Sequence, residues 1–141
     1  MTELKELIKP YMSEYRYLHT VSVADECIRL SRLFDVDMDT LTTAAYLHDI
    51  TKEMPYDEQL SLCGEMGIIL TEADKTSVKA LHSFTAPAFI QKHFPDYATK
   101  EVLDAVKYHT TGRAGMTLTE KLLYLADFIE PTRKYEECIN L

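Results

Sequence analysis

The chain is 141 residues long, with 46% hydrophobic residues, 27% charged residues and a formal net charge of −8. This size and composition are typical of one globular domain with a substantial core. The acidity, with no basic cluster, argues against a nucleic-acid partner, and no apolar run is long enough for a membrane span. The absence of a signal-peptide pattern and three widely spaced cysteines without a CxxC pair predict reduced thiols in a cytoplasmic protein.

Helical spacing of apolar residues runs along the whole chain. The expected helix starts, in chain order, are Thr2, Ser13, the polar break 35–39, Pro55 as a first helical residue, Thr71, Ser83, Thr99 and Thr117 or Thr119. The expected ends are Pro10, about Phe34, His48-Asp49, Gly64 or Gly67, Pro95, His109 and Pro131. No stretch has strand alternation, and neither a repeat nor a linker divides the chain. The sequence therefore predicts one all-α domain over residues 1–141, with roughly six to eight helices.

The dipeptide His48-Asp49 ends the third expected helix. Leu41, Ala44 and His48 share one face of that helix, because they are three and four residues apart. A helix buries its apolar face, so an imidazole is carried toward the core beside a carboxylate. Burial of Asp49 would be costly unless a charged partner, hydrogen bonds or a metal compensates for it. The alternative is a satisfied core histidine next to a solvated aspartate.

Four of the five histidines lie on, or at the end of, separate expected helices, and two aspartates accompany them. These six side chains are His19, His48, Asp49, His82, His109 and Asp127. Imidazoles and carboxylates without thiolates suit iron, manganese, zinc or magnesium, and six ligands exceed what one tetrahedral site needs. They are enough for two bridged metals about 3.5–4 Å apart, an arrangement that hydrolyses phosphate esters and anhydrides. The alternative is a set of scattered structural histidines, since spacing does not show that the helices converge.

Four sequence blocks, in this order, resemble a known family. The blocks are RYLHT at 16–20, LHDITK at 47–52, HTTG at 109–112 and YLADFIEPTR at 124–133. They resemble the HD-domain superfamily of metal-dependent phosphohydrolases and, within it, the YqeK-type symmetrical diadenosine tetraphosphate hydrolases. The resemblance runs over about residues 1–135 and implies a helical bundle of the HD type. Family members usually continue for some tens of residues beyond the last block, so we expect a truncated or short member.

The resemblance also implies a ligand set and a reaction. His19, His48, Asp49 and Asp127 would bind one metal, and Asp49 would bridge to a second metal held by His82 and His109. Iron is the metal that the family suggests, with manganese, zinc or magnesium as alternatives. The implied reaction splits diadenosine tetraphosphate into two ADP through attack of a metal-bridging hydroxide on an inner phosphorus. The predicted catalytic residues are Asp49 and Lys52, whose ammonium would stabilise the developing negative charge.

Further residues are candidate contacts to the nucleotide substrate. They are Arg16, Lys52, Thr110, Gly112, Arg113 and Arg133. An arginine guanidinium can grip a phosphate, and a glycine lets backbone approach it closely. The alternatives are that Lys52 is a solvated lysine after a helix, that the arginines are surface residues and that the glycine only serves the turn. The family also suggests a homodimer.

Other functions compete with this hypothesis. The same HD pattern serves phosphohydrolases of deoxynucleotides and of alarmones. It also serves cyclic-dinucleotide phosphodiesterases, but their Gly-Tyr-Pro signature is not found in this sequence. A non-catalytic nucleotide-sensing module would be expected to lack some of the six ligands. A helical interaction domain with structural histidines would be expected to carry no metal on purification.

Overall fold

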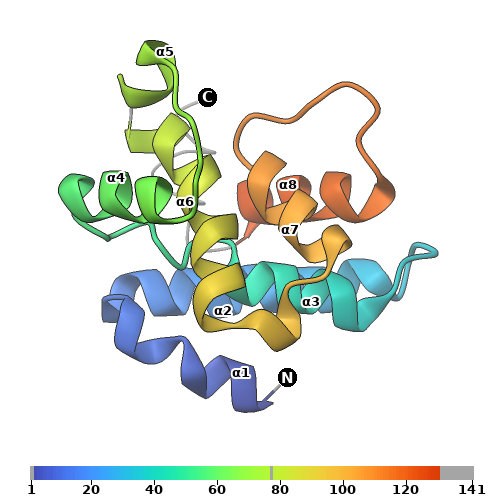
Figure 1. Ribbon diagram of the computed structural model, residues 1–141. Coiled ribbons are helices and arrows are strands. Elements are labelled where there is room, and N and C mark those ends of the chain that lie inside the picture. The colour runs from blue at the N-terminus through green and yellow to red at the C-terminus, as the bar shows by residue number, and fades with distance from the viewer. Residues whose placement is uncertain (1, 77, 131–141) are drawn as a thin grey trace.

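The computed structural model describes residues 2–76 and 78–130. In these residues the chain forms eight α-helices, two 3-10 helices and no strand (Figure 1). The elements are α1 (Thr2–Leu7), η1 (Lys9–Tyr11), α2 (Glu14–Ser31), α3 (Met38–Leu47), α4 (Tyr56–Glu65), α5 (Glu72–Lys75), α6 (Val78–His93), η2 (Pro95–Tyr97), α7 (Lys100–Tyr108) and α8 (Leu118–Ile129). The predicted all-α fold is confirmed. The same range holds no helix with the length and apolarity that a membrane crossing requires.

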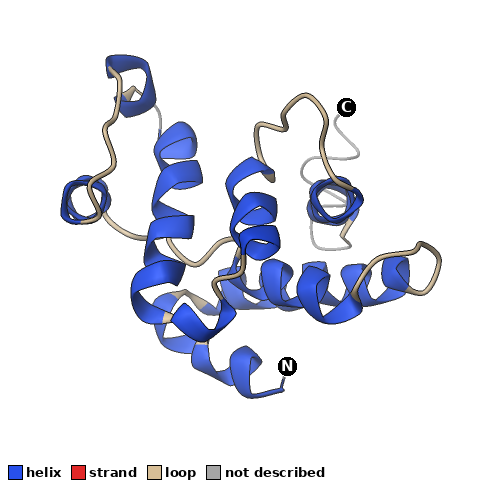
Figure 2. Cartoon of the chain, turned by 45° about the vertical axis from the view of Figure 1, so that its right-hand side comes forward, coloured by secondary structure: helices blue, strands red, loops and turns tan. Residues whose placement is uncertain are grey.

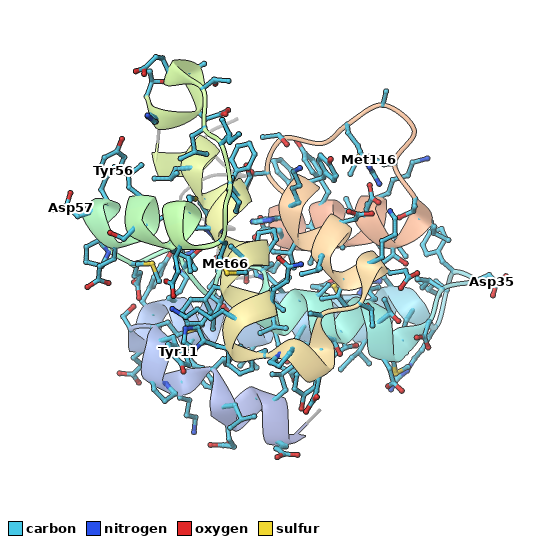
Figure 3. All side chains as sticks on the ribbon, in the orientation of Figure 1. Tyr11, Asp35, Tyr56, Asp57, Met66 and Met116 are labelled. Atoms are coloured by element: carbon cyan, nitrogen blue, oxygen red, sulfur yellow. The ribbon has the colours of Figure 1, made fainter. Side chains whose placement is uncertain are left out.

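Helix α3 lies at the centre of the packing. It contacts α2, α7 and α8, while α6 packs against α7 and α4. Figure 2 shows α2 and α3 side by side, with α6 and α7 standing above them. Every residue from 41 to 50 is buried. His48 and Asp49, which follow the last residue of α3, therefore lie in the interior. Exposed Asp35, after α2, and exposed Asp57, at the start of α4, lie at opposite edges of the molecule (Figure 3).

Most helix starts follow the local capping signals in the sequence. The side chains of Ser13, Thr71, Thr99 and Thr117 each accept a hydrogen bond from the backbone N–H three residues later. Each such cap contributes about 1 kcal/mol to helix stability. The four predicted caps are confirmed, and Thr117 rather than Thr119 opens α8.

Two predicted boundaries are displaced. Helix α2 ends at Ser31, and the chain then turns through Phe34, whose N–H donates to the Leu30 carbonyl. Leu33 and Phe34 are 66% and 46% exposed, so no core contact extends the helix over them. Pro55 is the cap of α4 rather than its first helical residue, because its ψ of 146° is extended.

The predicted helix start at Ser83 is wrong. Helix α6 runs without a break from Val78 to His93 and contains Pro87 in its interior. Proline has no N–H to donate to the carbonyl four residues earlier and usually bends or ends a helix. Buried apolar residues on both sides of Pro87 hold the two halves together against α4 and α7: Leu81, Ala86, Ala88, Phe89 and Ile90. Tertiary packing therefore outweighs the local signal.

Two of the cysteines lie within the described residues. Cys27 and Cys63 are both free, as predicted, and both are buried. Burial raises the pKa of the Cys27 thiol to about 12, so this side chain acts as a small apolar core residue. Cys138 lies outside the described residues.

Candidate metal centre

Two of the candidate ligands are held by the ends of their own helices. His48 follows α3 and His109 follows α7, and both imidazoles are buried. The His48 Nδ1 lies 2.6 Å from the Ala45 carbonyl oxygen, and the His109 Nδ1 lies 2.5 Å from that of Val106. A carbonyl oxygen can only accept, so each Nδ1 carries the proton. The Nε2 of each ring is therefore the nitrogen that can bind a ligand.

His19 is oriented by a residue that the sequence analysis missed. Its Nδ1 lies 2.8 Å from Oε1 of Glu130, which follows α8 and has no exposed surface. A carboxylate that accepts from one imidazole nitrogen fixes the ring and makes the other nitrogen a better metal ligand. The sequence signals for Glu130 are its position three residues after Asp127 and its place in the block YLADFIEPTR at 124–133.

Asp49 lies between the four imidazoles. Its Oδ2 is 3.4 Å from Nε2 of His19 and 3.4 Å from Nε2 of His48. Its Oδ1 is 3.5 Å from Nε2 of His82 and 3.7 Å from Nε2 of His109. Each oxygen of one carboxylate thus faces a different pair of imidazoles, which is the arrangement that a bridging ligand needs.

Asp127 completes one side of this cluster. Its Oδ1 lies 3.0 Å from the His19 Nε2 and 3.5 Å from the His48 Nε2, on the side of the Asp49 Oδ2. The structure therefore brings together all six residues that the sequence proposed as ligands, from five separate segments. The convergence of these helices is what spacing alone could not show.

The cluster fits divalent cations. Among the described residues, the buried Nε2 atoms of His19, His48 and His82 have no hydrogen-bond partner. Donor atoms of His19, His48 and Asp127 lie within 4.8 Å of one another, as do those of His48, Asp49 and His109. Buried polar atoms are rarely left unpaired, and mixed imidazole and carboxylate donors suit borderline or hard metal ions. Bound metal ions would satisfy these nitrogens.

The charges within the cluster couple metal binding to proton release. Burial opposes the charged form of His48, but the carboxylates of Asp49 and Asp127 outweigh it and raise the pKa of His48 to about 9. Burial also opposes the charged form of Asp49, yet the surrounding imidazoles hold its pKa well below the usual value. Without metal, His48 therefore carries a second proton, on Nε2, at neutral pH. A metal ion that binds Nε2 must displace this proton.

A cavity of about 570 Å³ opens beside the cluster. Its lining consists of Tyr15, Arg16, His19, Asp49, Lys52, His109, Thr110, Tyr124, Asp127 and Phe128. Three of the predicted substrate contacts, Arg16, Lys52 and Thr110, are in this lining. Arg16 also lies against the cluster itself, with its Nη1 3.0 Å from the Asp49 Oδ2.

Two other predicted substrate contacts, Gly112 and Arg113, do not line this cavity. Gly112 occupies the left-handed region at φ +68°, where it turns the chain after α7. Arg113 forms two hydrogen bonds of 2.8 and 2.6 Å to the buried carboxylate of Glu120, and its guanidinium lies 4.3 Å from the ring centre of Tyr108. Arg133 lies outside the described residues.

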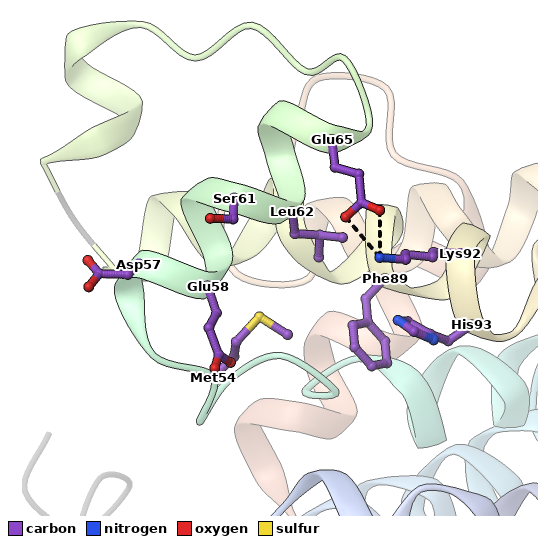
Figure 4. Close-up of a pocket in the computed structure, with 9 residues that line it drawn as sticks. All are labelled: Met54, Asp57, Glu58, Ser61, Leu62, Glu65, Phe89, Lys92 and His93. Carbon is purple, nitrogen blue, oxygen red and sulfur yellow. Dashed lines mark hydrogen bonds and ion pairs between the residues drawn. The ribbon is translucent and has the colours of Figure 1, made fainter.

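A second, smaller pocket of about 310 Å³ lies between α4 and α6 (Figure 4). Its lining consists of Met54, Asp57, Glu58, Ser61, Leu62, Glu65, Phe89, Lys92 and His93. The ammonium of Lys92 is paired with Glu65 at 2.7 Å. His93, the fifth histidine, is exposed. No group of metal-binding side chains gathers in this pocket within the described ranges, so the candidate site is the His/Asp cluster.

Comparison with known proteins agrees with this site. The family model of the HD domain matches residues 16–132, and the chain belongs to the HD-domain family. It is similar to two proteins named symmetrical bis(5'-nucleosyl)-tetraphosphatase. The one from Halalkalibacterium halodurans is 33% identical over 132 residues, which are 92% of this chain and 68% of the relative. The one from Staphylococcus aureus is 38% identical over 135 residues, which are 92% of this chain and 66% of the relative.

A solved structure shows the same fold. It is described as a predicted HD superfamily hydrolase involved in NAD metabolism, from Clostridium acetobutylicum. Its TM-score is 0.87 at 28% sequence identity, and the match covers 99% of this chain and 73% of that chain. The resemblance to HD-domain proteins and to symmetrical tetraphosphatases is therefore confirmed.

Proposed function

We propose that this HD-domain hydrolase cleaves diadenosine tetraphosphate symmetrically into two ADP at a two-metal centre. The observation that supports it most is the position of Asp49, whose two oxygens face two different pairs of imidazoles. The relatives named symmetrical tetraphosphatase support the substrate. Iron as the metal, a homodimer and a cytoplasmic location belong to the same proposal and rest on the family resemblance and composition.

The six clustered residues would divide between the two metals. His19, His48, Asp127 and the Asp49 Oδ2 would hold one ion, and His82, His109 and the Asp49 Oδ1 would hold the other. Bound divalent metals acidify water and neutralise charge on phosphoryl oxygens. Glu130 orients the imidazole of His19 toward its ion.

The cavity walls supply groups for both parts of the substrate. Arg16, Lys52 and Thr110 offer positive charge and hydrogen bonds to a polyphosphate chain. Tyr15, Tyr124 and Phe128 line the same cavity with 56%, 44% and 45% of their surface exposed. Exposed aromatic faces can stack on adenine, so the cavity combines phosphate-binding and base-binding groups.

The products distinguish this proposal from other cleavages. Purified, iron-loaded protein is incubated with diadenosine tetraphosphate, and the nucleotides are separated by anion-exchange chromatography. We expect ADP alone, because cleavage of the central anhydride gives two identical halves. A mixture of AMP and ATP would contradict symmetrical cleavage, and no turnover with both metals bound would contradict this substrate.

The role of Lys52 is testable separately from metal binding. We expect Lys52→Ala to lower kcat by about 10²–10³-fold, because a charge aimed at the developing phosphoryl oxyanion contributes that much. Metal content should not change, since Lys52 is not one of the six clustered residues. Lys121→Ala, on the exposed part of α8, is the matched control. An unchanged kcat in Lys52→Ala would remove Lys52 from the reaction.

A further inference from the structure

His82 differs from the other three clustered histidines in what holds its Nδ1. A backbone carbonyl or a carboxylate accepts from the Nδ1 of His19, His48 and His109. The Nδ1 of His82 instead lies 2.9 Å from the hydroxyl oxygen of Thr51. A hydroxyl can donate as well as accept. The contact with Thr51 therefore does not by itself decide which nitrogen of His82 carries the proton.

The hydroxyl of Thr51 belongs to a buried chain of hydrogen bonds that reaches α4. Thr51 Oγ1 lies 2.9 Å from Thr85 Oγ1, and Thr85 Oγ1 lies 2.9 Å from Oε1 of Gln59. Gln59 Nε2 then donates to the Met54 carbonyl oxygen at 2.8 Å. Thr51, Thr85 and Gln59 all have no exposed surface, so water does not compete for these groups.

The Met54 carbonyl determines which group donates and which accepts in each of these hydrogen bonds. A carbonyl only accepts, so the amide nitrogen of Gln59 must face it, and the amide oxygen must face Thr85. Thr85 therefore donates its one proton to Gln59 and accepts from Thr51. Thr51 has then donated its own proton and can only accept from His82. The proton of His82 lies on Nδ1, and the lone pair of Nε2 faces the Asp49 Oδ1.

Each other assignment of donors and acceptors leaves a buried polar atom without a hydrogen bond. If Thr51 donated to His82 while Thr85 donated to Gln59, two hydroxyl oxygens would lie 2.9 Å apart with no proton between them. If Thr85 donated to Thr51, or to the His82 carbonyl at 3.3 Å, the Gln59 Oε1 would lose its donor. A buried acceptor without a donor costs about 1–3 kcal/mol. Only one direction places a proton in every short contact.

We infer that Gln59 and Thr85 are positioning residues that act through Thr51 to fix the metal-binding tautomer of His82. The inference rests on His82 being a metal ligand, as proposed above, but not on the identity of the substrate. The chain of hydrogen bonds opposes the effect of Asp49 on the same ring. Without metal, the Asp49 carboxylate lies 3.5 Å from the His82 Nε2 and favours a proton there. The hydrogen bonds from Gln59 through Thr85 and Thr51 keep the proton on Nδ1 and leave Nε2 unprotonated.

The test compares two substitutions of Thr85 in the metal-free protein. Thr85→Val keeps the shape of the side chain and removes the hydroxyl, whereas Thr85→Ser keeps the hydroxyl and removes a methyl group. The ¹⁵N chemical shifts of the His82 ring show which of its two nitrogens carries the proton. We expect a proton on Nδ1 in the wild type and in Thr85→Ser. In Thr85→Val, Thr51 is free to donate to Nδ1, and the proton should move to Nε2.

Metal affinity gives the second measurement. Titration with Mn²⁺ against a competing chelator should show one of two sites weakened about 10–100-fold in Thr85→Val, and near-normal affinity in Thr85→Ser. Gln59→Met, which removes the acceptor at the far end, should repeat the result if Thr85→Val does not fold. A His82 proton that stays on Nδ1 in the folded variants would overturn the inference, even if the variants were less stable. The tautomer does not depend on turnover, so failure here is distinct from failure of the proposed activity.

Discussion

Replacing Asp49 by alanine is expected to remove both metals and to lower kcat/KM by about 10³-fold or more. Both metals would lose a ligand at once, because the two oxygens of this carboxylate face different pairs of imidazoles. A thousandfold loss corresponds to about 4 kcal/mol of transition-state stabilisation, which is the scale of metal-ion catalysis. Metal content by plasma mass spectrometry and turnover are measured on the same preparation.

Two companion variants make this result interpretable. Asp49→Asn keeps the shape of the side chain but cannot bridge with two charged oxygens, so it should also lose metal and activity. Asp57→Ala removes an exposed carboxylate at the start of α4 and should change neither. Full activity of metal-free Asp49→Ala protein would contradict a metal-dependent reaction at this cluster. Loss of only one metal would contradict the bridging role.

Removal of the metals is expected to lower the melting temperature by about 10 °C or more. Ions that bind only the folded chain stabilise it by about 4 kcal/mol each when present at a thousand times their Kd. Without them, the buried Nε2 atoms of His19, His48 and His82 have no hydrogen-bond partner among the described residues. The measurement is differential scanning calorimetry before and after dialysis against a chelator.

The chelator effect should depend on the cluster. In Asp49→Ala, which is expected to lack both ions from the start, dialysis against the chelator should leave the melting temperature unchanged. Restoring a divalent metal to the dialysed wild type should restore its melting temperature. A wild-type protein that melts at the same temperature with and without chelator would argue that the histidines are structural.

The parts of the fold that could be predicted are those that depend on residues close together in the sequence. The caps at Ser13, Thr71 and Thr99 are local, because each side chain reaches a backbone N–H three residues away. Local signals alone also led to the wrong helix start at Ser83, inside α6. Pro87 breaks helices in isolation, yet the packing of α6 on α4 and α7 carries the helix through it.

The candidate ligands could be named from the sequence, but the residues that orient them could not. Glu130 is 111 residues from His19, and Gln59 acts on His82 through two threonines that come from other segments. A glutamate or glutamine in a helical pattern normally predicts a solvated surface. Their burial is a property of the assembled helices, so no spacing rule reveals it.

The predicted substrate contact of Arg113 stays a prediction. Arg113 is four residues after His109 and was predicted to contact the substrate. In the structure the left-handed turn at Gly112 precedes it, and its guanidinium is hydrogen-bonded to Glu120. A predicted contact in a loop depends on the path of the backbone, which charge and spacing do not define.

Anomalous X-ray diffraction from crystals of the metal-loaded protein tests the central claim most directly. We expect two metal peaks per chain, about 3.5–4 Å apart, one beside each oxygen of Asp49. The first should lie among His19, His48 and Asp127, and the second should lie between His82 and His109. A single peak on one side of Asp49, or metal bound elsewhere in the chain, would contradict it.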